Sequence, residues 1–88
     1  MLDYPYKWTK TKSQLPTEED TTGGYIWVLF EYENHLWEDV VSWDDNIKKF
    51  INDYGIEIGF MVYAWKPYTK EDAIRLSKES IRRFEENA

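Results

Sequence analysis

Few side chains in this sequence could act as nucleophiles, general bases or metal ligands. The chain contains no Cys and a single His, His35. The absence of Cys excludes disulfides, thiolate metal sites and thiol chemistry, and one His cannot form a multi-His metal site. His35 follows Asn34 in a predicted turn, where we expect a solvated imidazole without a catalytic role. We therefore predict no catalytic residues and a protein that is not an enzyme.

Neighbouring carboxylates are present, but their setting argues against catalysis or metal binding. Hydrolysis by two carboxylates needs a cleft that holds them several ångströms apart, and 88 residues without a recognisable motif offer little material for one. Asp44-Asp45-Asn46 superficially resembles the start of a calcium-binding loop, but the sixth position of such a loop is Gly, whereas here it is Lys49. Gly23-Gly24 alone does not make a phosphate-binding loop. We predict neither a metal nor a cofactor.

Acidic side chains are concentrated in one stretch of the chain. The formal net charge is −6, yet residues 1–12 carry +2 and residues 48–88 carry +1. Residues 13–47 contain nine Asp and Glu and no Lys or Arg. An acidic chain repels phosphate backbones and anionic lipid, so we expect no direct contact with nucleic acid or a membrane. The acidic stretch instead predicts a surface for a basic protein partner.

The leading hypothesis is a non-enzymatic domain that docks a basic partner through the acidic 18–45 region. In its sharpest form this is an inhibitor that mimics nucleic acid, of the kind that would serve a virus against a DNA- or RNA-binding protein. Carboxylates two residues apart on a strand lie about 6.5–7 Å apart, much like neighbouring phosphates, and a two-residue turn is expected to place Glu38 across from Glu31. An aromatic ring among acids suits Lys and Arg. The expected partner-binding residues are Glu18, Glu19, Asp20, Glu31, Glu33, Trp37, Glu38, Asp39, Asp44 and Asp45.

Three other interpretations of the same residues stay open. The acids could form only a solvated face or protect a strand edge from aggregation. Exposed aromatic side chains such as Trp65 and Tyr68 could bind a sugar or another small ligand. The chain could also be a homodimeric structural subunit that pairs through a strand edge. No signal segment and no apolar run of about 18 residues is seen, so a cytoplasmic location is expected.

The predicted fold is a single α+β domain over residues 1–88, with a core in residues 25–88 and a partly extended or mobile segment in residues 1–24. Alternating aromatic residues in 1–12 indicate a short edge strand, and residues 13–24 read as a loop. Residues 25–32 are almost continuously apolar and predict a central strand. Residues 56–65 predict another strand, and Thr69 to Asp72 resembles a capping box that opens a final helix with a buried apolar stripe.

Residues 33–54 allow two interpretations. A turn after Tyr32 would make residues 36–41 a second strand of a hairpin. However, Leu36, Val40, Trp43, Ile47, Phe50 and Tyr54 recur at helical spacing. Ser42 to Asp45 resembles a capping box, which predicts a helix from Trp43 to Tyr54 ended by Gly55 and leaves 36–41 free as a strand. We favour the hairpin, which gives the order (β)ββαβα: a mostly antiparallel sheet of three to four strands with two helices on one face.

Overall fold

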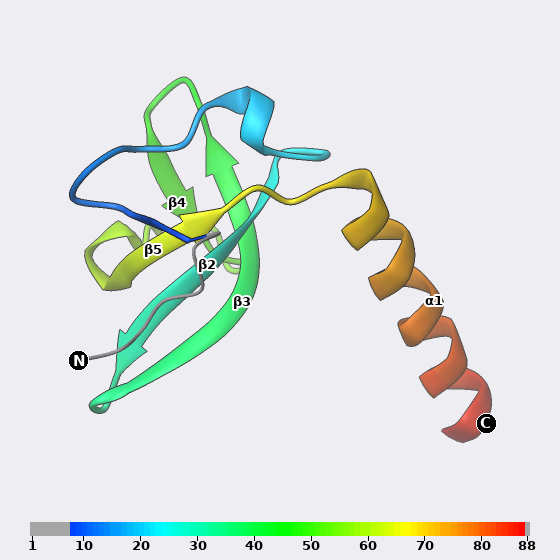
Figure 1. The fold of residues 1–88 in the computed structure, drawn as a ribbon. Helices are drawn as coiled ribbons and strands as arrows, with labels where there is room; N and C mark the ends of the chain where they lie inside the picture. Colours follow the sequence, from blue (N-terminus) through cyan, green and yellow to red (C-terminus); the bar gives the residue numbers. More distant parts are fainter. Residues whose placement is uncertain (1–7, 88) are drawn as a thin grey trace.

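The computed structural model describes residues 8–87 as one antiparallel sheet followed by one helix. The coarse α+β class is as predicted, but the sheet has five strands in the order β1-β5-β2-β3-β4 and there is one α-helix in the described residues (Figure 1). The elements are β1 (Thr9–Lys10), a 3₁₀ turn η1 (Glu18–Asp20), β2 (Tyr25–Tyr32), β3 (His35–Asp44), β4 (Lys49–Ile51), a 3₁₀ turn η2 (Gly59–Met61), β5 (Val62–Lys66) and α1 (Lys70–Asn87).

The predicted hairpin is confirmed and forms the long axis of the sheet. Strands β2 and β3 pair antiparallel from Tyr25 opposite Ser42 to Tyr32 opposite His35. The two-residue turn between them is Glu33-Asn34, with φ values of 53° and 64°. Positive φ at both central residues matches the twist of the flanking strands, and Asn tolerates this conformation better than most residues. Strand β2 is central, as its apolar sequence predicts, because β3 and β5 flank it.

The predicted helix from Trp43 to Tyr54 is wrong. Strand β3 continues to Asp44, a turn spans residues 45–48, and β4 follows. The Asp44 carboxylate accepts backbone hydrogen bonds from Asn46 at 3.0 Å and Ile47 at 3.4 Å. An Asp carboxylate accepts N–H groups of the second and third following residues both at helix starts and at tight turns. The sequence Ser42 to Asp45, which resembles a capping box, therefore leads into a turn.

The β–α–β passage through residues 36–65, which the predicted order implies, is therefore absent. Strand β5 pairs antiparallel with β2, not parallel, with Val28 opposite Trp65. The predicted strand over residues 56–65 is shorter than expected, because the 3₁₀ turn η2 precedes β5 and an isolated bridge joins Glu57 to Ile51. Because β2 serves as the partner of β5, the sheet needs no crossover helix.

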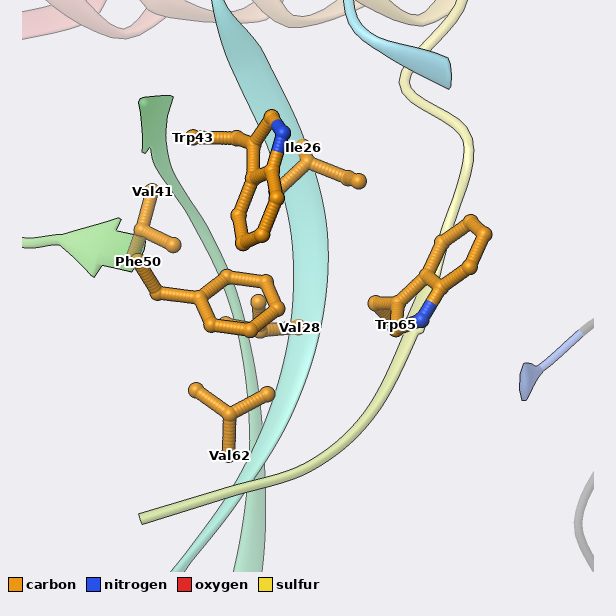
Figure 2. Close-up of a cluster of buried hydrophobic side chains, with 7 residues drawn as sticks. All are labelled: Ile26, Val28, Val41, Trp43, Phe50, Val62 and Trp65. Atoms are coloured by element: carbon orange, nitrogen blue, oxygen red, sulfur yellow. The ribbon is translucent and has the colours of Figure 1, made fainter. Parts of the chain in front are cut away.

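The buried core lies on one face of the sheet, hereafter the core face. Seven side chains gather there, between 0% and 7% exposed, and Figure 2 shows the Phe50 ring near Trp43 and Val62. The Phe50 and Trp43 ring centroids are 4.8 Å apart. Period-two spacing along β2 and β3 selects these residues. The cluster consists of Ile26, Val28, Val41, Trp43, Phe50, Val62 and Trp65.

The segment before β2 covers part of this core and is anchored by specific bonds. Strand β1 pairs with β5 at the sheet edge, as the predicted edge strand requires, whereas residues 1–7 of that prediction lie outside the described residues. In the predicted loop, Pro16 is buried and the Gln14 carbonyl accepts a hydrogen bond from Trp65 Nε1 at 2.8 Å. The loop also contains η1, which the sequence did not predict.

Helix α1 begins as predicted but does not pack as predicted. The Asp72 N–H donates to Thr69 Oγ1 at 3.1 Å, and the Thr69 N–H donates to Asp72 Oδ2 at 3.2 Å, which confirms the capping box. The helix then stands beside the sheet and runs away from it (Figure 1). The expected burial of its apolar stripe is wrong, because Ile74 and Ile81 are each 56% exposed and Phe84 is 76% exposed.

Candidate functional site

Strand alternation divides the acids of the β2–β3 hairpin between the two faces of the sheet. Glu31 and Glu38 lie on the outer face, because Glu38 is paired with Leu29, which is two residues from Glu31. Asp39 is paired with Val28 and lies on the core face. The acids therefore do not form one continuous row along the hairpin.

The expected position of Glu38 directly across from Glu31 is wrong. The register places Leu36 opposite Glu31, and Leu29 opposite Glu38. The cause is the turn at Glu33-Asn34, which lies one residue earlier than that pairing requires. Glu31 and Glu38 remain diagonal neighbours on the same face, a relation that spans about 7–8 Å.

The outer-face acid Glu38 is partly neutralised within the chain. Lys66 Nζ lies 3.6 Å from Glu38 Oε1. The same ammonium group lies 4.7 Å from the centroid of the Trp8 ring and 5.2 Å from that of Trp27. A cation held by two rings and a carboxylate is already satisfied within the chain. This part of the predicted acidic surface therefore has less free charge than the sequence suggests.

The tip of the hairpin combines both signs of charge. Glu31 and Glu33 line an open hollow of about 930 Å³ together with Lys10 and Lys12. Phe60, which is 83% exposed, lies on its wall. Lys10 and Lys12 are thus neighbours of the acids at the hairpin tip, although some twenty residues separate them in sequence.

A second acidic group lies at the opposite end of the hairpin. Glu18, Asp44 and Asp45 line a hollow of about 500 Å³. A hydrogen bond from Lys48 at 2.9 Å, and then one from the Trp43 indole, hold the pKa of Asp45 below its usual 3.8. Asp44, the last residue of β3, and Asp45, the first residue of the turn, both hold the turn through their carboxylates, which favours a structural role for them.

The remaining predicted residues of this region belong to η1. Asp20 accepts a hydrogen bond from the backbone N–H of Thr17 at 2.9 Å and thereby closes the turn, while Glu19 is exposed. The Asp20 carbonyl accepts a hydrogen bond from the Tyr68 N–H at 3.0 Å, which joins η1 to the segment before α1. Asp20 therefore fixes local structure, and Glu19 is the more available of the two.

A third concavity, hereafter the acidic cleft, has a different composition. Its volume is about 250 Å³, and it lies between the hairpin and the segment that joins β4 to β5. Apolar side chains form one part of its wall, and polar groups form the rest. The lining residues are Phe30, Asp39, Val40, Val41, Asn52, Asp53, Tyr54, Ile58 and Met61.

Hydrogen bonds from the backbone hold the outer wall of the cleft in place. Asn52 Oδ1 accepts the N–H groups of Tyr54 at 2.9 Å and Ile56 at 3.0 Å. Gly55 adopts φ 77°, which favours glycine, and donates its N–H to the Asn52 carbonyl. These contacts fix the turn and leave Tyr54 87% exposed above the cleft. The wall is thus formed before any partner arrives.

Trp37 lies next to the acidic cleft although it does not line it. It pairs with Phe30, which does line the cleft, and it is two residues from Asp39 on the same strand. Its side chain is 51% exposed and its indole N–H donates to the Tyr32 carbonyl at 3.4 Å. Of the ten predicted residues, Asp39 and Trp37 are the two that the fold brings to this cleft.

Sequence reasoning missed the other side of the cleft. Asp53 and Tyr54 were assigned to the end of a helix that does not form, with Gly55 as the residue that ends it. The available signal was the run Asn52 to Gly55, since Asn and Gly three residues apart are also typical of a turn. The 4-3 apolar spacing that extends through Tyr54 instead favours a helix over the same residues.

The cleft has the chemistry to accept one basic side chain. A volume of about 250 Å³ is below the roughly 300–1,000 Å³ typical of small-molecule pockets. The apolar wall suits the methylene stem of Lys or Arg, and the carboxylates of Asp39 and Asp53 suit its charged head.

Within residues 8–87, no three His, Asp or Glu side chains gather closely enough to hold a metal ion. In the same part of the chain, no helix has the length and apolar character to cross a membrane. Comparison with known proteins found no matching family model, no matching curated protein and no matching solved structure.

Proposed function

We propose that this chain is a non-enzymatic protein-binding domain that docks a basic partner by taking a Lys or Arg side chain into the acidic cleft. The observation that carries the proposal is the pairing of Asp39 and Asp53 with an apolar wall in one concavity. Neither carboxylate has an ion pair with a Lys or Arg among the described residues.

The absence of an internal cation among the described residues favours the cleft over the other acidic groups. Glu38 is neutralised by Lys66, Asp45 by Lys48, and the hairpin tip carries Lys10 and Lys12 beside its acids. A partner's cation would compete with these internal cations at each of those places. In the cleft it would instead find two carboxylates without an internal cation in the described part of the chain, of which Asp39 Oδ1 accepts only the Val40 N–H at 2.8 Å. It would also find an apolar wall for its stem, and removing that stem from water contributes about 0.8 kcal/mol per CH₂ group.

Trp37 and Tyr54 extend the same surface beyond the cleft. Both are more than half exposed, and both aromatic rings suit contact with a second cation or with the partner's backbone. The sharper form of the sequence hypothesis, mimicry of a nucleic-acid strand, needs a row of acids. The diagonal pair Glu31 and Glu38 on the outer face supports it less well than the cleft supports the insertion of a single side chain.

The proposal is tested by titrating ¹⁵N-labelled protein with the peptide Gly-Arg-Gly-Lys-Gly-Arg-Gly and following the backbone amide resonances. We expect localised shifts at Asp39, Tyr54 and Ile58, and binding that weakens as salt is raised. A peptide with Gln in place of Arg and Lys serves as the probe control. Shifts that are absent, or that spread evenly over all acidic segments, would refute the cleft as the binding site.

A matched pair of variants separates the cleft from overall charge. Asp39→Asn with Asp53→Asn removes two negative charges from the cleft, and Glu19→Gln with Glu71→Gln removes two from exposed positions elsewhere. We expect the first pair to weaken peptide binding about tenfold or more, since charged hydrogen bonds contribute roughly 1.5–3 kcal/mol each. Equal weakening by both pairs would mean that only net charge matters.

A further inference from the structure

Helix α1 presents one side toward the sheet. Asp72 accepts a hydrogen bond from Trp27 Nε1 at 3.0 Å, and this bond joins the first turn of the helix to β2. Leu76 and Glu79 follow at steps of four and three residues, so they lie within about 40° of Asp72 around the helix axis. These three account for most of the half-buried positions in the helix, the other being Ala73.

The apolar side of the helix points the other way. At about 100° per residue, Ile74 and Ile81 lie roughly 160–200° from Asp72. They are each 56% exposed, and Phe84, which is nearest to them at the C-terminal end, is 76% exposed. These exposed fractions mean that no other part of the described chain covers the stripe. Figure 1 shows α1 standing apart from the strands over most of its length.

The spacing of the stripe is that of a helix that pairs with another helix. Ile74, Ser77, Ile81 and Phe84 follow one another at steps of three, four and three, the alternation of the two seam positions in a seven-residue repeat. In this register Asp72 and Glu79 occupy the position farthest from the seam. Pairing along the seam would therefore leave the Trp27–Asp72 hydrogen bond in place.

We propose that the occupant of this stripe is α1 of a second copy of the chain, in a parallel two-helix pair. The flanking charges decide the direction. In a parallel pair, Ala73 faces Lys78 of the second copy and Ser80 faces Glu85, so no like charges oppose each other. In a fully overlapping antiparallel pair, Lys78 faces its own symmetry mate and Glu71 faces Glu85, which opposes like charges twice.

The apolar area that two copies of α1 can bury limits the stability of the dimer. The exposed parts of Ile74, Ile81 and Phe84 amount to roughly 400 Å² per copy, or about 800 Å² for the pair, before flanking side chains are counted. Specific interfaces begin near 1,200 Å². Ser77 is polar at a seam position and lowers the apolar area further. We therefore expect a weak dimer that is populated only at high protein concentration.

Sedimentation velocity over a concentration range from about 1 to 500 µM tests the proposal on the full chain. The wild-type protein is expected to shift from monomer to dimer, and Ile81→Glu is expected to remain monomeric with its helix content unchanged by circular dichroism. Ser77→Leu fills the seam and is expected to lower the dissociation constant at least tenfold. The matched control Arg75→Leu places the same side chain outside the seam and is expected to have no such effect.

A single cysteine, introduced into this Cys-free chain, tests whether the two helices of the pair run parallel or antiparallel. Ile74→Cys places two thiols at the same level in a parallel pair, so oxidation yields a disulfide-linked dimer. In the antiparallel pair the thiols lie far apart and no linked dimer accumulates. A wild-type chain that stays monomeric at 500 µM, or a dimer that Ile81→Glu leaves intact, would overturn the assignment, the second result pointing to the strand edge instead.

Discussion

A turn and β4 replace the predicted helix from Trp43 to Tyr54, and this leads to opposite expectations for two apolar residues, Ile47 and Phe50. In a helix from Trp43 to Tyr54, Ile47 and Phe50 would share one buried stripe, and truncating either would be costly. In the fold, Phe50 is 2% exposed within the core, whereas Ile47 lies in the turn and is 54% exposed. Substituting each by Ala therefore measures which structure forms in solution.

The expected losses differ by severalfold. Phe50→Ala removes a buried ring that packs 4.8 Å from the Trp43 ring, and such truncations cost about 3–5 kcal/mol. Ile47→Ala removes a largely exposed side chain and should change stability by less than about 0.5 kcal/mol. A chain of 88 residues has a total free energy of unfolding of about 4–13 kcal/mol, so the first variant loses a large fraction of it.

Urea unfolding followed by tryptophan fluorescence provides the assay, because Trp43 and Trp65 are buried in the core. With a urea dependence near 1.5 kcal/mol per molar, Phe50→Ala should lower the midpoint by roughly 2–3 M and Ile47→Ala by less than about 0.5 M. If Phe50→Ala is unfolded in water, Phe50→Leu gives a smaller, measurable loss. Similar losses of stability at both positions would refute the turn and would support a helix over residues 43–54.

Two further predictions concern the hairpin turn and the helix cap. Glu33→Asn combined with Asn34→Gly should raise the free energy of unfolding by up to about 1 kcal/mol, because both positions have positive φ. Thermal unfolding measures this change, and a lower free energy of unfolding would place the turn one residue later. Asp72→Asn should cost about 1 kcal/mol at pH 7 by weakening the cap. Burial raises the pKa of Asp72, but hydrogen bonds from Trp27 and Thr69 outweigh it and set the pKa below 3.8. The ionised carboxylate therefore stabilises the fold fully above pH 3.8, and this stabilisation is lost as the pH falls through the lowered pKa of Asp72. The difference in free energy of unfolding between wild type and variant should shrink in acid, and a difference that is constant with pH would contradict this.

The elements that the sequence predicts correctly are those whose signals are local. Consecutive β-branched and aromatic residues determine the central strand at 25–32, since such side chains fit the pleated surface of a sheet. The capping box at Thr69 and Asp72 is set by two side chains three residues apart, and α1 begins there for that reason. Composition also determines the acidity of residues 13–47 and the absence of thiol chemistry.

The candidate site could be predicted only in part. Asp39 and Trp37 were selected from the acidic stretch, but Asp53 and Tyr54 reach the cleft only because the chain turns at Asn52 and Gly55. Local sequence could not decide this, since the same Asp and Gly residues begin and end helices as readily as turns. Pairing of β4 with β3 decided it, by joining residues five to nine positions apart in a ladder that a helix over the same segment could not form.

Charge shows the same division between sequence and tertiary structure. The sequence determines that nine acids fall in one stretch of 35 residues. Only the fold determines their surroundings: strand alternation sends Asp39 to one face and Glu38 to the other, and Lys66 is brought to Glu38 by the pairing of β5 with β2. Because electrostatic interactions depend on distance through space and not along the chain, an acidic segment becomes a binding site only where tertiary structure leaves its carboxylates without an internal cation.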